Sequence, residues 1–77
     1  MDRENALTRK KLKQIETVKE FEELLSLVML SEEEKQMLRM HYKDKKTMQC
    51  IADEMGLSEI SVKKMHKRAL TKIRKLF

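Results

Sequence analysis

A single glycine, Gly56, interrupts a chain of 77 residues that contains no proline. The segment before it has helical apolar spacing, made by Met48, Ile51, Ala52 and Met55. Because glycine tolerates the left-handed conformation that ends many helices, Gly56 predicts a helix C-terminus. Leu57 is the apolar residue that such turns bury, and Ser58 is placed to cap the next helix. Two helices joined in this way are typical of a helix-turn-helix motif, whose second helix enters the major groove of DNA.

Length and composition favour a small helical protein. The 77 residues hold one small domain with a modest core and leave little room for an enzyme active site. Hydrophobic and charged residues each make up 40% of the chain, and no stretch shows sustained β-alternation. We therefore expect an all-α fold, in which an N-terminal amphipathic helix precedes a C-terminal helix-turn-helix.

Membrane and enzymatic functions lack their usual sequence signals. The longest apolar run, residues 24–30, is shorter than the roughly 20 residues of a membrane span. The N-terminal sequence MDRENALTRK contains no signal-peptide apolar core, so we expect a cytoplasmic protein without a membrane partner. No nucleophile-base pair, metal cluster or glycine-rich phosphate loop is present, so we expect no enzymatic activity, no cofactor and no bound metal.

The cysteine and the two histidines are interpreted as structural residues. Cys50 is the only cysteine, which excludes an internal disulfide, and we expect it to be a small, partly buried hydrophobic residue. His41 and His66 lie in different segments without matching acidic or cysteine partners. We expect both to be structural, with a groove-facing position as the alternative for His66.

Charge is distributed unevenly along the chain. Residues 1–40 carry eight basic and nine acidic side chains, a net charge of −1, whereas residues 41–77 carry ten basic and four acidic ones, a net charge of +6. Positive charge on a helix is by itself explained as a solvent-exposed face that keeps the protein in solution. Here the positive charge coincides with the helix-turn-helix pattern, which favours nucleic-acid binding.

The N-terminal pattern predicts one helix from about Asn5 to Met29. Its apolar positions recur every three or four residues and are Leu12, Ile15, Val18, Phe21, Leu25 and Val28. Residues 21–30 offer more apolar surface than one narrow stripe requires, which implies a partner helix from the same chain or from a second copy. We therefore divide the chain into residues 1–30, an amphipathic helix for packing or homodimerisation, and residues 31–77, the DNA-binding domain.

A capping box starts the next predicted helix. Ser31 can accept from the backbone N–H of Glu34, whose side chain reaches back. This helix carries Met37, Leu38 and Met40 and should end near Tyr42, before the polar run of residues 43–46. Thr47 then caps the first helix of the helix-turn-helix motif.

The last predicted helix, from about Glu59 to Leu76, has an apolar and a basic side. The core side consists of Val62, Met65, Ala69, Leu70, Ile73 and Leu76. The opposite side consists of Ile60, Lys63, Lys64, Lys67, Thr71 and Arg74, with Ser58, Glu59 and Ser61 at the N-terminal tip. This tip is the part expected to enter a major groove.

Three segments carry a family resemblance. They are LSEEEKQMLRMHY, IADEMGLS and SVKKMHKRALTKIRKL, and each matches a helix or turn of one domain. With these segments, residues 30–77 closely resemble region 4 of bacterial sigma-70 family factors, the part that recognises the upstream promoter element.

The resemblance implies which residues meet DNA. It places Glu59, Ile60, Ser61, Lys63 and Lys64 at base or adjacent phosphate contacts, and Lys45, Lys46, Thr47, Lys67 and Arg68 at backbone contacts. With the capping residue Ser58, the predicted DNA-binding set is Thr47, Ser58, Glu59, Ile60, Ser61, Lys63, Lys64, Lys67 and Arg68.

The tip departs from the family, whose members often have arginine there. Glu59 can accept from a cytosine amino group and Ile60 can touch a thymine methyl group. The alternatives are that Glu59 satisfies the helix dipole and that Ile60 faces a protein partner.

Two functions follow from these observations. The first is a sequence-specific, double-stranded DNA-binding transcriptional regulator, similar to standalone region 4-like proteins. Because the resemblance covers none of the sigma regions that bind core polymerase and open the promoter, we expect that it does not initiate transcription alone. The second is a protein-interaction module, such as a sigma fragment, a split-sigma subunit or an adaptor, that docks on RNA polymerase or another transcription factor. Ile60 and a methionine-rich surface formed by Met29, Met37, Met40 and Met48 favour this alternative.

Overall fold

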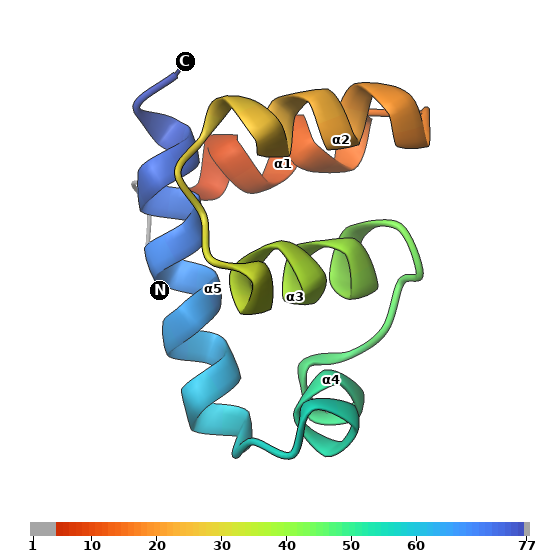
Figure 1. Cartoon of the computed structure of the whole chain (residues 1–77), viewed down its shortest axis with the longest axis vertical. Helices are drawn as coiled ribbons and strands as arrows, with labels where there is room; N and C mark the ends of the chain where they lie inside the picture. Colours follow the sequence, from red (N-terminus) through yellow and green to blue (C-terminus); the bar gives the residue numbers. More distant parts are fainter. Residues whose placement is uncertain (1–4, 77) are drawn as a thin grey trace.

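The computed structural model describes residues 5–76, which form five α-helices and no strand (Figure 1). The helices are α1 (Ala6–Gln14), α2 (Val18–Leu27), α3 (Glu32–Tyr42), α4 (Met48–Met55) and α5 (Glu59–Arg74). The longest helix, α5, runs along one side of the molecule, and the other helices lie across it or beside it (Figure 1). The predicted all-α fold is confirmed. No helix within residues 5–76 has the length and apolar character needed to cross a membrane.

One hydrophobic core joins all five helices. Its largest fully buried apolar side chains are Leu12, Phe21, Leu25, Met37, Leu38, Ile51, Val62 and Ile73. Burial of each such side chain contributes about 1.5–3 kcal/mol relative to exposure. Because α1 and α2 supply three of these residues, the N-terminal segment is part of the same core as the helix-turn-helix.

The N-terminal segment is broken into two helices, so the prediction of one helix from Asn5 to Met29 is wrong. The chain becomes extended at Ile15, and Thr17 caps α2, with its hydroxyl accepting from the backbone N–H of Glu20 at 3.1 Å. Leu12 and Phe21 thus enter the core from two separate helices. Ile15 before the break and Phe21 after it both pack in or against that core, but Val18, which was expected on the same apolar face, is 63% exposed.

The predicted helix signals after residue 30 are confirmed. Ser31 and Glu34 form both hydrogen bonds of the capping box, and α3 ends at Tyr42. Thr47 caps α4 by accepting from the backbone N–H of Cys50, and Gly56 ends it with a φ of 70°. These local bonds fix where α3, α4 and the turn begin and end.

Three side-chain predictions are wrong. Cys50 is exposed on α4, with its Sγ 3.6 Å from a carboxylate oxygen of Glu54. The helix α5 ends at Arg74, and Leu76, which was expected in the core, is exposed beyond it. Met37 and Met40 face the core from α3, so they cannot form the expected methionine-rich surface.

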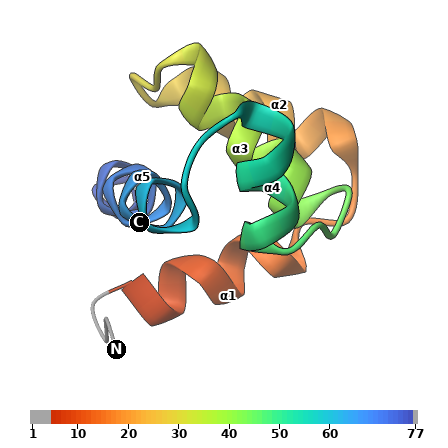
Figure 2. The same cartoon turned by 90° about the horizontal axis from the view of Figure 1, so that it is seen from below.

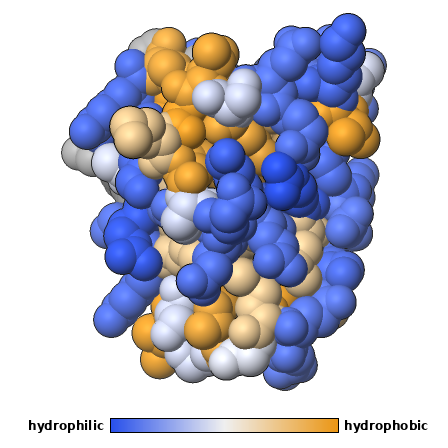
Figure 3. All heavy atoms as spheres, viewed as in Figure 1, coloured by the Kyte–Doolittle hydropathy of each residue, from blue (hydrophilic) through white to orange (hydrophobic). Residues whose placement is uncertain are grey.

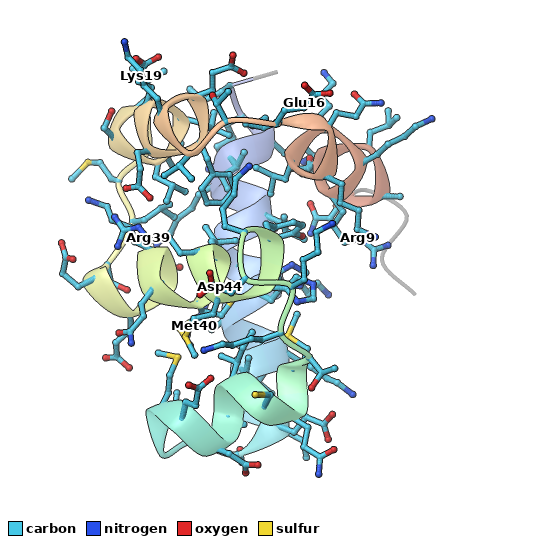
Figure 4. All side chains as sticks on the ribbon, turned by 90° about the vertical axis from the view of Figure 1, so that its right-hand side faces the viewer. Arg9, Glu16, Lys19, Arg39, Met40 and Asp44 are labelled. Carbon is cyan, nitrogen blue, oxygen red and sulfur yellow. The ribbon has the colours of Figure 1, made fainter. Side chains whose placement is uncertain are left out.

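Side-chain ion pairs connect the helices across the molecule. Arg39 of α3 (labelled in Figure 4) donates two hydrogen bonds, of 2.6 and 2.7 Å, to the carboxylate of Glu22 on α2. Lys72 of α5 donates a hydrogen bond of 3.0 Å to the carboxylate of Glu34. The same carboxylate accepts from the backbone N–H of Ser31 in the capping box of α3. Burial by itself raises the pKa of Glu34, but the hydrogen bonds from Ser31 and Lys72 outweigh it and lower that pKa.

Candidate nucleic-acid interface

The turn between α4 and α5 sets the angle at which the tip of α5 leaves the molecule. Leu57 donates its backbone N–H to the carbonyl of Ala52 at 2.9 Å, and its side chain packs partly buried against the core. Ile51 of α4 and Val62 of α5 are fully buried on either side of this turn. The turn therefore holds the first turn of α5 beside α4 at one end of the molecule (Figure 1).

The predicted tip residues are together and exposed. Ser58 caps α5 by accepting from the backbone N–H of Ser61 at 3.1 Å, and its hydroxyl donates to the Ser61 hydroxyl at 2.9 Å. Glu59 lies in the first helical turn, 3.9 Å from Lys63, where a negative charge is favourable to the helix dipole. Ile60 is 67% exposed. A short, polar tip with one projecting apolar side chain is thus presented to solvent.

A basic flank continues along α5 from this tip. We use this name for Lys64, Lys67 and Arg68, which are exposed and line a surface hollow of about 390 Å³ together with Ser61. Within residues 5–76, none of these three cations forms an ion pair. Their charge is therefore available to an anionic partner.

The second part of the predicted set lies at the start of α4. Thr47 is exposed and caps this helix. Lys46 forms an ion pair of 2.8 Å with Glu54, which raises the pKa of Lys46 and lowers that of Glu54. Lys45 has a φ of 57°, an uncommon left-handed conformation for a residue other than glycine. Part of the positive charge near Thr47 is thus balanced within the protein.

A cluster of aromatic rings joins α3 to α5. The hydroxyl of Tyr42 and Nε2 of His66 are 2.7 Å apart, and the ring of His41 packs edge-on against His66 with the ring centroids 5.2 Å apart. Burial lowers the pKa of His66 to about 4, and burial likewise raises the pKa of Tyr42. His66 is therefore neutral at neutral pH and occupies the structural position expected for it.

The sequence prediction missed the cationic side chains of α1. Arg9 and Lys13 are far from α4 in the chain, but Lys13 and Thr47 line one pocket in the folded protein. A basic run at residues 9–13 was visible in the sequence. Its position beside α4 depends on how α1 packs, which local patterns do not reveal. Within residues 5–76, no group of three histidine, cysteine or acidic side chains is arranged to hold a metal ion.

Comparison with known proteins identifies the family. The sequence model of the family described as "Sigma-70, region 4" matches residues 26–75, from the end of α2 to just past the end of α5. No curated protein sequence and no solved structure matches the chain significantly. The matched family is one of DNA-binding helix-turn-helix domains with roles in transcription, not a family of enzymes. More than half of the chain is covered by the match, and the protein belongs to the sigma-70 region 4 family.

Proposed function

We propose that the protein is a sequence-specific regulator of transcription that binds duplex DNA with the tip and basic flank of α5. The observation that carries this proposal is the unpaired basic flank directly behind the exposed tip. Lysine and arginine side chains bind phosphates and release counterions, while side chains at a helix tip contact base edges. These two requirements meet on one helix, in a family whose domains bind DNA.

The proposed contacts divide the predicted set by chemistry. Glu59 and Ile60 read bases, through a cytosine amino group and a thymine methyl group respectively. The cations Lys63, Lys64, Lys67 and Arg68 and the hydroxyls of Thr47, Ser58 and Ser61 contact phosphates or fix the position of the tip.

Substitution of one flank lysine tests the proposal. If four to six phosphates are neutralised, a plot of log affinity against log salt has a slope of roughly −4 to −5 for the wild-type chain. Lys64→Ala removes one contact, so it weakens duplex binding and makes the slope shallower by about 1. Lys19→Ala, on α2 at the opposite end from α4 (Figure 4), makes the same change in net charge and leaves both values unchanged. A flat salt dependence for the wild-type chain contradicts the proposal.

Docking on RNA polymerase or another transcription factor is the second candidate function. An apolar patch, formed by Leu27, Met29 and Leu76, is exposed where the ends of α2 and α5 meet (Figure 3). Lys72 and Lys75 line the hollow of about 290 Å³ in this patch, so an acidic, apolar partner segment fits it. Leu27→Asp is expected to abolish retention of core polymerase without weakening duplex binding. Absence of retention by the wild-type chain removes this function.

Homodimerisation is a separate proposal, and it uses the same patch. Leu27 and Met29 are 71% and 94% exposed, an unusual position for large apolar side chains at the end of an amphipathic helix. A two-fold symmetric dimer also suits the symmetric sites of many helix-turn-helix proteins. Sedimentation equilibrium at high micromolar concentration tests it: twice the chain mass supports the dimer, and the mass of one chain contradicts it.

A further inference from the structure

A second basic surface is formed in part by residues outside the family match. A pocket of about 400 Å³ lies between the end of α1, the end of α3 and the loop that leads to α4. It is lined by Lys13, His41, Tyr42, Lys45, Lys46 and Thr47. Figure 2, which looks onto α4, shows α1 passing α5 and ending near this loop. Lys13 belongs to the segment before residue 26, where the family match begins.

Several hydrogen bonds build the walls of this pocket. Lys43 donates to the carbonyl of Ile15 at 2.6 Å and lies 5.0 Å from the ring centroid of Phe21, which ties the end of α1 to the loop. Nδ1 of His41 is 3.0 Å from the carbonyl oxygen of Lys46. The backbone N–H of Lys46 donates to the carbonyl of Met40. The loop and α1 are thus held together, which brings Lys13 to the same pocket as Thr47.

The pocket has more cations than balancing acids. Within residues 5–76, Lys13 and Lys45 form no ion pair and no acidic side chain lines the pocket, while Glu54 and Asp44 act on Lys46. Arg9 of α1 adds a further charge nearby, since it partly opposes the rise that burial causes in the pKa of Tyr42. The N-terminus of α4, at Thr47, contributes partial positive charge from its backbone N–H groups.

We propose that this pocket holds a backbone phosphate of the duplex that α5 binds, with Lys13 and Lys45 as its cationic ligands. The inference rests on the proposed DNA-binding function and extends it to a contact made by α1. Thr47 connects the two surfaces, because it lines the pocket and also caps the helix that packs against α5. The bound duplex is therefore held at two places, by α5 in the groove and by α1 and the loop on the backbone.

The test measures duplex binding over a salt series for Lys13→Ala and Lys45→Asn. Asparagine is chosen at position 45 because it tolerates the left-handed conformation of that residue. Each variant is expected to bind the preferred duplex and an unrelated duplex more weakly by the same factor, with a salt slope shallower by about 0.9. The ratio of wild-type to variant affinity then falls about 3.5-fold for a fourfold rise in salt. Lys19→Ala is the matched control and is expected to behave as the wild type.

The outcomes separate this inference from the proposed function. If Lys64→Ala makes the slope shallower but Lys13→Ala and Lys45→Asn keep the wild-type slope, the phosphate contact is overturned and the proposed function stands. If the wild-type chain binds no duplex, both are overturned. A titration with inorganic phosphate, followed through the NMR signals of the His41 ring, tests whether the pocket binds a free phosphate ion instead of DNA. If the signals saturate with phosphate and Lys13→Ala binds duplex as tightly as the wild type, the assignment to a DNA phosphate is overturned.

Discussion

Gly56 fixes the turn through its backbone conformation and not through lack of space. Its φ is 70°, and a Cβ added at this position has no heavy atom within 4 Å. Gly56→Ala is therefore expected to lower the free energy of unfolding by about 1–2 kcal/mol, the cost of a left-handed conformation for an L-residue. Gly56→Asn should cost less, because asparagine populates that conformation more readily. Urea denaturation of the three proteins measures this, and equal stabilities of the alanine and asparagine variants contradict it.

We expect Glu54 to compete with a DNA phosphate for Lys46, because the two side chains form an ion pair in the protein alone. Their ion pair lowers the pKa of Glu54, so the pair is intact at neutral pH and is lost only below the usual range of a glutamate. Glu54→Gln should free Lys46 for a phosphate, which strengthens duplex binding and makes the salt slope steeper. Asp53→Asn makes the same charge change at an exposed neighbour on α4 and is the control. Equal gains in affinity for the two variants show a general charge effect and contradict the competition.

At the scale of elements, local hydrogen bonding explains what the sequence predicts well. The caps Ser31, Thr47 and Ser58 bond to backbone groups three residues ahead, so their pattern is visible without the fold. The break between α1 and α2 was missed because apolar spacing continues through it. A capping signal was present, since Thr17 precedes Glu20 by three residues.

The same contrast between local pattern and long-range packing applies to the candidate site. The tip and basic flank of α5 belong to one helix, so helical periodicity places them correctly on the exposed side. Lys13 lines the same pocket as Thr47 because α1 packs on the core through Leu12 and Lys43 bonds to the carbonyl of Ile15 across the fold. The exposure of Leu76 likewise depends on where α5 stops, a detail that the apolar pattern does not contain.

The junction of α3 and α5 should make stability depend on pH. The pKa of His66 is about 4 in the folded protein, below the ordinary histidine value of 6.5 that applies to the unfolded chain, so protonation favours unfolding. The stabilisation is complete above pH 6.5 and is lost as the pH falls towards 4, by about 2 kcal/mol between pH 7 and pH 5. His66→Gln, which keeps an acceptor for the Tyr42 hydroxyl, should remove this dependence. An unchanged pH profile of the unfolding free energy in the variant contradicts the assignment to His66.

At the scale of the whole molecule, the family match begins at residue 26, but the core begins earlier. Phe21 of α2 is fully buried, and its ring centroid lies 6.3 Å from that of Tyr42 on α3. Phe21→Ala should cost about 3–5 kcal/mol, a large part of the stability of a small domain. Because the core is shared, α5 should unfold in the same transition. Val18→Ala, at a 63% exposed position of the same helix, is the control. A helix-turn-helix that stays folded in a separate transition contradicts a single shared core.

Selection of bound duplexes from a random pool, with each enriched site retested over a salt series, measures the proposed function most directly. Base contacts by the tip of α5 and phosphate contacts by its basic flank predict one enriched motif, bound with a slope of roughly −4 to −5. The symmetry of that motif also reports whether one or two copies bind. Recovery of no motif, with weak binding to all sequences, contradicts sequence reading by α5 and favours docking on RNA polymerase.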